Sequence, residues 1–134
     1  MNWKLILRLS MFGLAMGLAT VFFIPPNIEP AVWLAIFAIC AFLIARGTSS
    51  NAFQHGVYLG LANSVWITIA HVVFYDQYIP THAREAAMLQ MTPFTDAPRM
   101  MMVLTGPVVG VLSGIVIGVF SFVASRFVKP ARVL

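Results

Sequence analysis

The stretch MMMVLTGPVVGVLSGIVIGVFSFVASRF, residues 100–127, decides the fold class. It contains no charged residue before its last two positions, and about 20 apolar residues are enough for a helix to cross the hydrocarbon core of a bilayer. Gly106, Gly110, Gly114 and Gly118 recur at every fourth position, which puts them on one face of a helix. We therefore predict a membrane-spanning helix with a smooth strip that allows close packing.

The rest of the chain has the same character. The 134 residues are 60% hydrophobic and only 9% charged, too few polar residues to cover the surface of a soluble domain. The N-terminal segment has the basic start and apolar run of a signal peptide, but it lacks a clear small-x-small site before a polar region, so we expect it to be retained as a span. We predict an all-α integral membrane protein, residues 1–134 forming a single domain and a four-transmembrane-helix bundle. The expected spans are about 5–24, 30–45, 52–78 and 100–127.

The distribution of charge predicts the orientation of the bundle. An arrangement with the N-terminus inside places six basic residues in the cytoplasm: Lys4, Arg8, Arg46, Arg126, Lys129 and Arg132. Only Arg84 and Arg99 then fall outside, together with all four acids. This is the positive-inside pattern. We expect both termini to be cytoplasmic, in a bacterial inner membrane, and the net charge of +4 to reflect topology and not nucleic-acid binding.

Small residues mark the helix faces that are expected to pack. Besides the glycines of the last span, Gly13 and Gly17 lie in the first span, and Gly56 and Gly60 in the third. Small residues let helix backbones approach closely in lipid, where there is no hydrophobic drive between helices. Packing within one chain is the preferred interpretation, and a homo-oligomer seam along the last span is the alternative.

A polar stripe climbs the third span. At 100° per residue Ser64, Thr68, His71, Tyr75 and Tyr78 lie close to one line on the helix surface. An ionisable residue inside a span is a functional candidate, although a neutral His71 can also simply hydrogen-bond to the next helix. If the stripe lines a path, the chain has to act as a homodimer, because four spans enclose little of a pore.

The segment HVVFYDQYIPTHARE, residues 71–85, leads into the loop between the last two spans. After Pro80 we expect a short interfacial helix capped by Thr81. His82 and Glu85 are three residues apart on one face of it, a spacing that offers two ligands to a divalent ion. Further ligands would have to come from elsewhere in the fold, and a local pair of side chains is the simpler interpretation.

Methionine and cysteine bear on a second metal hypothesis. Five of the eight methionines lie near the same loop: Met88, Met91, Met100, Met101 and Met102. Thioethers suit Cu(I), but methionine is also an adaptable filler of helix contacts. Cys40 is the single cysteine, which excludes an intrachain disulfide, a CxxC redox centre and a thiolate cluster.

Three segments carry a resemblance: NAFQHGVYLG (51–60), YDQYIP (75–80) and GVLSGIVIG (110–118), followed by a basic tail. With these the chain resembles a group of small four-span bacterial membrane proteins with a domain of unknown function, and the resemblance implies no activity.

No recognisable catalytic motif occurs, so we expect no enzymatic role and no cofactor. The preferred function is an accessory, assembly or regulatory bundle that binds lipid or another membrane protein. A homodimeric transporter or channel and a metal-binding protein are the alternatives.

Overall fold

The computed structural model describes residues 1–131. This part of the chain is all-α, 81% helical and without strands. Its four long helices are α1 (Trp3–Phe22), α2 (Glu29–Gly47), α3 (Ala52–Val73) and α6 (Pro98–Phe127). Each is long and apolar enough to cross a membrane, which confirms the all-α fold class and the expectation of four candidate spans.

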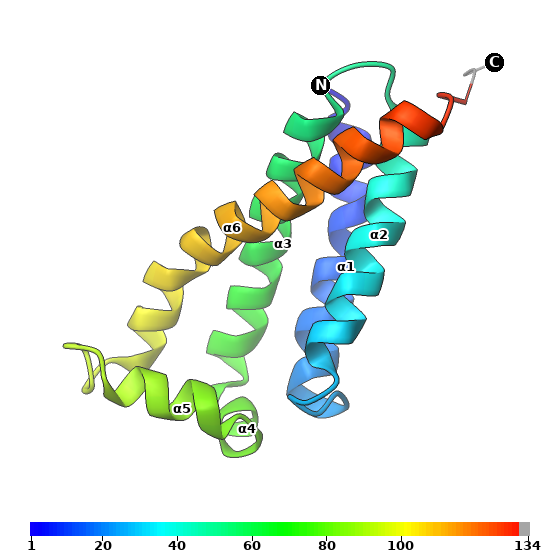
Figure 1. Ribbon diagram of the computed structural model, residues 1–134. Coiled ribbons are helices and arrows are strands. Elements are labelled where there is room, and N and C mark those ends of the chain that lie inside the picture. Colours follow the sequence, from blue (N-terminus) through cyan, green and yellow to red (C-terminus); the bar gives the residue numbers. More distant parts are fainter. Residues whose placement is uncertain (132–134) are drawn as a thin grey trace.

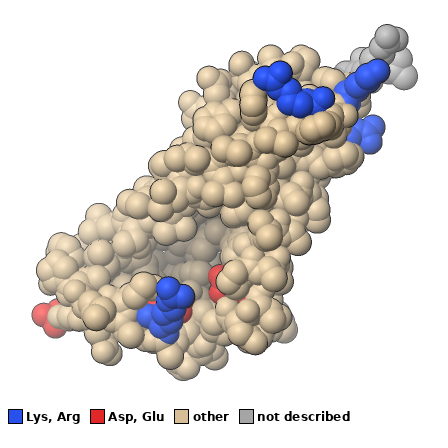
Figure 2. Space-filling model, in the orientation of Figure 1, with Lys and Arg blue, Asp and Glu red and all other residues tan. Residues whose placement is uncertain are grey.

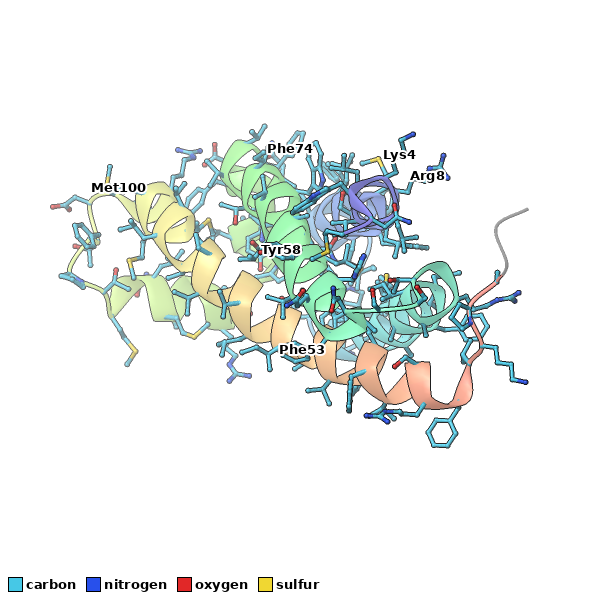
Figure 3. The ribbon with its side chains drawn as sticks, turned by 90° about the horizontal axis from the view of Figure 1, so that it is seen from above. Lys4, Arg8, Phe53, Tyr58, Phe74 and Met100 are labelled. Carbon is cyan, nitrogen blue, oxygen red and sulfur yellow. The ribbon has the colours of Figure 1, made fainter. Side chains whose placement is uncertain are left out.

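Helix α3 is the central element. It packs against α1 on one side and along α6 on the other, and α2 joins the bundle through α6. Figure 1 shows α6 crossing α2 near the end of the molecule that holds both chain termini, and leaving it toward the other end. Viewed from above, α3 and α6 cross, while Lys4 and Arg8 point away from the bundle (Figure 3).

The apolar core lies in the half of the bundle near the termini. Cys40, Ile44, Leu59 and Ile117 are fully buried there and pack together with Leu9. Basic side chains gather at the same end (Figure 2). Arg132, one of the residues expected in this group, lies outside the described residues.

Glycines occupy the seams between helices of one chain. A Cβ atom on Gly60 would overlap Gly114, and one on Gly56 would overlap Gly118, so the backbones of α3 and α6 are in direct contact. The remaining glycines of these strips face side chains across the same seam or the α1–α3 seam: Gly106 faces Thr68, Gly110 faces Ser64, Gly13 faces Asn63 and Gly17 faces Ala70.

Helix α3 ends earlier than the sequence suggests. The third span was expected to reach residue 78, but α3 stops at Val73 because Phe74 leaves the helical conformation (φ −101°, ψ 32°). The chain continues through the short helices α4 (Tyr75–Tyr78) and η1 (Ile79–Thr81) into α5 (Ala83–Gln90). The other expected spans differ from the observed helices by only one or two residues at each end.

One histidine has a structural role at the end of the molecule near the termini. The backbone N–H of Asn2 donates to Nε2 of His55 at 2.9 Å, and Nδ1 of His55 lies 2.9 Å from the carbonyl oxygen of Asn51. The His55 side chain is buried. Both ring nitrogens are therefore used to fix the N-terminus against the start of α3.

Candidate functional site

A cavity of about 770 Å³ is bordered by α2, α3, α5 and α6; we call it the inner slot. Each of these helices contributes one stripe of side chains to the wall. In Figure 2 the hollow is visible on the face of the molecule toward the viewer. Apolar side chains make most of the wall, among them Phe37, Ile67 and Val109.

Helix α5 closes one end of the inner slot. Glu85, Met88 and Leu89 of α5 border the cavity together with Thr92, which follows the helix. The spacing of the first three, i, i+3 and i+4, puts them on one helix face. Met91, between Leu89 and Thr92 in sequence, is 87% exposed. The short helix expected from sequence is therefore present and amphipathic, and its apolar face is turned toward the slot.

The inner slot opens sideways between α2 and α6. Leu34 of α2 and Val109 of α6 border the cavity and are still 56% and 57% exposed. Along α6 the wall extends from Met101 to Val116, about 22 Å at the usual helical rise. The opening thus lies along the apolar length of the candidate spans.

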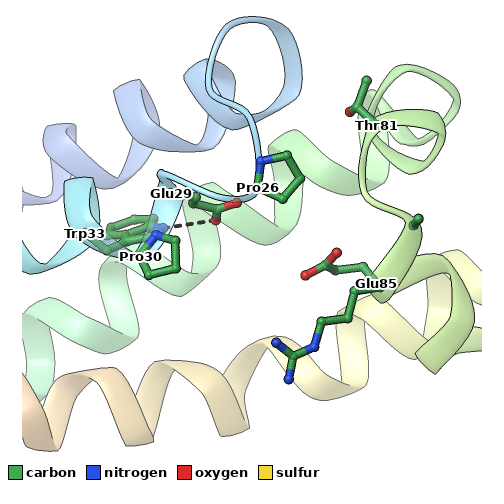
Figure 4. Close-up of a pocket in the computed structure, with 8 residues that line it drawn as sticks. Pro26, Glu29, Pro30, Trp33, Thr81 and Glu85 are labelled. Atoms are coloured by element: carbon green, nitrogen blue, oxygen red, sulfur yellow. Dashed lines mark hydrogen bonds between the residues drawn. The ribbon is translucent and has the colours of Figure 1, made fainter.

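A second, outer hollow of about 500 Å³ adjoins the α5 end of the slot (Figure 4). Glu29, Pro30, Trp33 and Glu85 border both spaces, so they mark the junction between them. In Figure 4 the carboxylate of Glu85 points across the hollow toward Glu29. The combined site is therefore apolar along the slot and acidic at the junction.

Three aromatic rings stack beside this junction. The Tyr78 ring lies between His71 and His82, with centroid distances of 3.9 Å on both sides. Nε2 of His71 is 2.9 Å from the hydroxyl oxygen of Thr20. Because the Thr20 hydroxyl donates to the carbonyl of Gly17, the His71 ring N–H is the donor in this bond. The expected hydrogen bond of His71 to a neighbouring helix is thus present, and it reaches α1.

The surroundings of Tyr78 keep its phenol protonated. The residue is 5% exposed, and burial raises the pKa of the Tyr78 hydroxyl, with the charges of Glu29 and Glu85 raising it further. Tyr78 therefore serves as a neutral ring in the stack and not as a source of protons near neutral pH.

His82 links α5 to the start of α2. Its ring is fully buried, Nδ1 lies 2.9 Å from the carbonyl oxygen of Tyr78, and Nε2 lies 3.5 Å from Oε2 of Glu29. The other oxygen of Glu29 accepts a hydrogen bond from the Trp33 indole at 3.2 Å. Nδ1 of His82 also lies 2.9 Å from the hydroxyl oxygen of Thr81, so the ring is held by the turn before α5 and reaches α2 through Nε2.

Several buried polar atoms have no hydrogen-bond partner within residues 1–131. They are Nδ2 and Oδ1 of Asn63, Nε2 of His82 and Oε2 of Glu85. Buried polar groups are nearly always paired in folded proteins. The Asn63 amide lies against Gly13 in the α1–α3 seam, whereas Glu85 borders both spaces, where its free oxygen is placed to accept a hydrogen bond from a bound molecule.

The predicted polar stripe is only partly assembled. Ser64, Thr68, His71 and Tyr78 border the inner slot, but Tyr75 does not. Because α3 ends at Val73, Tyr75 belongs to α4 and is no longer in line with the stripe. The centroid of the Tyr75 ring instead lies 4.7 Å from the guanidinium carbon of Arg99. Nη2 of Arg99 also forms an ion pair with Oδ2 of Asp76 at 3.1 Å.

The predicted pair of His82 and Glu85 is not formed, because His82 precedes α5 and faces Glu29 instead. Thr81 does not cap α5 either; its hydroxyl donates to the carbonyl of Tyr78 at 3.0 Å. In the described part of the chain no three His, Cys, Asp or Glu side chains are placed to hold a metal ion. Of the five methionines considered for copper, three border the slot: Met88, Met101 and Met102.

Glu29 and Trp33 were not among the residues predicted for the site. Glu29 is 53 residues from His82 in the chain, and nothing in the local pattern connects them. A usable signal existed at Asn63, a lone amide within an apolar run, and at Glu29, an acid at the start of an apolar helix.

Comparison of the chain with protein-family models, with curated proteins and with solved structures gave no match, so what the site can bind follows from its own geometry.

Proposed function

We propose that this protein is an integral membrane protein that holds one lipid-like amphiphile, with its apolar chain in the inner slot and its polar group in the outer hollow. The observation that carries the proposal is that the site has an apolar part, the inner slot, and a charged part, the junction with the outer hollow. The slot is mostly apolar and opens sideways at Leu34 and Val109, whereas the junction with the outer hollow carries Glu29 and Glu85. A membrane amphiphile has the same division between chain and headgroup.

The dimensions of the site support this occupant. Its volume of about 770 Å³ is within the roughly 300–1,000 Å³ typical of ligand sites. The wall of α6 extends for about 22 Å, most of the roughly 30 Å hydrocarbon thickness of a bilayer. A long, narrow, apolar slot suits an extended chain better than a compact ligand.

The proposed orientation follows from the distribution of charge. With both termini in the cytoplasm of a bacterial cell, the basic end faces inward and α5 lies at the outer surface of the inner membrane. The outer hollow is then at headgroup level, where an amphiphile entering from the outer leaflet would place its polar group. In this setting the protein acts as an accessory, assembly or regulatory subunit that binds lipid, alone or together with a partner membrane protein.

The homodimeric transporter or channel has weaker support. Its path requires the complete stripe from Ser64 to Tyr75, and Tyr75 is outside the slot. The glycine strip of α6 that would form a dimer seam is already buried against α3. The metal-binding alternative has weaker support as well. Glu29 and His82 could supply two ligands, but within residues 1–131 no third His, Cys, Asp or Glu side chain is placed to complete a site.

The test is a pair of matched substitutions on α6. Val109→Trp places a large ring in the slot, whereas Val108→Trp adds the same ring at the next position, which is 59% exposed and does not border the cavity. Native mass spectrometry after extraction in mild detergent should show one retained lipid per chain for the unaltered protein and for Val108→Trp. Val109→Trp should reduce that fraction by about tenfold, since steric exclusion removes the binding mode. Equal lipid retention in all three proteins would contradict the proposal.

A further inference from the structure

We infer that the site selects a phospholipid whose headgroup ends in a primary ammonium group, an inference that rests on the proposed lipid-binding function. It concerns the polar end, where the slot meets the outer hollow. Two carboxylates from distant parts of the chain meet there: Glu29 at the start of α2 and Glu85 in the first turn of α5. Their convergence makes the junction attractive to a cation.

The second observation is a shortage of hydrogen-bond donors. Oε2 of Glu85 is buried and has no partner in the described part of the chain, and the fully buried His82 has no hydrogen bond at Nε2. This Nε2 lies 3.5 Å from Oε2 of Glu29, whereas the free oxygen of Glu85 borders both spaces. The junction is completed by a group that brings several N–H donors.

A primary ammonium group matches this need. It carries three N–H donors and a positive charge, and charge-assisted hydrogen bonds to carboxylates are among the stronger ones in proteins. A quaternary ammonium group has the charge but no N–H, so it leaves Glu85 unpaired. A glycerol headgroup has donors but no positive charge.

The outer hollow also contains a side chain that can bind the phosphate group of a phospholipid. Arg84 lines it next to Glu85, and a guanidinium group is well suited to phosphate oxygens. The lipid headgroup that fits is therefore a zwitterion, with the ammonium group between Glu29 and Glu85 and the phosphate toward Arg84. The sideways opening at Leu34 and Val109 identifies the source as the surrounding bilayer and not the aqueous phase.

The experiment measures headgroup preference in lipid nanodiscs. The full chain is placed in equal parts of phosphatidylethanolamine, phosphatidylcholine and phosphatidylglycerol with identical acyl chains, and native mass spectrometry identifies the lipid that stays bound. We expect the primary-ammonium lipid to be retained about tenfold more than either of the others, as charged hydrogen bonds imply.

Two variants test whether the junction causes the preference for the primary-ammonium headgroup. Glu85→Gln keeps the shape of the side chain and removes its charge, and it should abolish the preference while a lipid is still retained. Asp96→Asn is the control, because Asp96 is exposed in the loop before α6 and borders neither space; it should bind as the unaltered protein does. Thermal unfolding in the same detergent checks that both variants are folded.

The outcomes separate the two proposals. Equal retention of the three lipids, with Val109→Trp still excluding all of them, would overturn the headgroup assignment and leave lipid binding intact. An unchanged preference in Glu85→Gln would overturn it as well. Failure of every lipid to be retained, in the unaltered protein as in Val109→Trp, would overturn both proposals.

Discussion

At the scale of single residues, His82 joins three parts of the chain: its own turn, Tyr78 and the start of α2. It is fully buried, stacks on Tyr78, bonds to the Tyr78 carbonyl and approaches Glu29 on α2. The sequence pattern predicted His71 and His82 as candidates, but the partner expected for His82 was Glu85. Thr20 comes to His71 and Glu29 comes to His82 through the packing of α1 and α2, which local spacing does not encode.

His82→Ala should destabilise the fold by about 2 to 3 kcal/mol, because truncating a buried ring leaves a cavity and unpaired neighbours. His82→Phe keeps the stacked ring and loses only the polar contacts, so it should recover about half of that loss. Thermal unfolding in one detergent measures both variants. Equal stability of His82→Ala and the unaltered protein would show that the stack is not structural.

At the scale of helices, three of the four long helices begin and end within one or two residues of the apolar runs in the sequence, since these runs end at charges or prolines. The end of α3 is different. The sequence offers its first clear helix breaker only at Pro80, whereas the turn occurs at Phe74, where Phe22 and Phe74 pack edge to face at 5.1 Å. A helix end without Gly or Pro is not visible in the sequence pattern.

The seam between α3 and α6 gives a prediction at this scale. Gly60→Ala should destabilise the bundle by about 1 to 3 kcal/mol because the new methyl group overlaps the backbone of Gly114, and overpacking outweighs the roughly 1 kcal/mol that alanine gains in helix propensity. Gly47→Ala is the matched control: its methyl group meets only the flexible end of Leu5, and we expect a change below about 0.5 kcal/mol. If the two variants have the same unfolding temperature, the close contact between α3 and α6 is not what holds the bundle.

At the scale of the whole molecule, charge and span number predict the orientation, and labelling can test it. Cys40 is fully buried, so the natural cysteine should react little with a membrane-impermeant maleimide. In intact cells whose outer membrane has been permeabilised, Asp96→Cys should be labelled, because its loop is expected to face outward. Asn2→Cys, at the other end of the molecule, should be labelled only after the inner membrane is opened. The opposite pattern would reverse the proposed orientation.

The inner slot could not be predicted at any of these scales from sequence. It depends on the angle at which α6 leaves α2, and crossing angles are set by the packing of both helices together. The residues that border it, such as Met101 and Val109, are ordinary apolar residues of a candidate span. Their common role follows only from the arrangement in space.

That arrangement has a consequence for the surrounding bilayer. With 30 residues α6 is about 45 Å long, whereas α2 with 19 residues is about 28 Å long. In the proposed membrane setting, with a hydrocarbon core of about 30 Å, we expect α6 to fit by tilting and α2 to fit upright. The slot is the wedge between a tilted helix and an upright one. A thicker bilayer would let α6 stand more upright and narrow the wedge, so lipid retention should fall steadily from nanodiscs of short-chain lipids to those of long-chain lipids; retention independent of chain length would show that the wedge is rigid. The thickness of the membrane would then regulate how much lipid the protein retains.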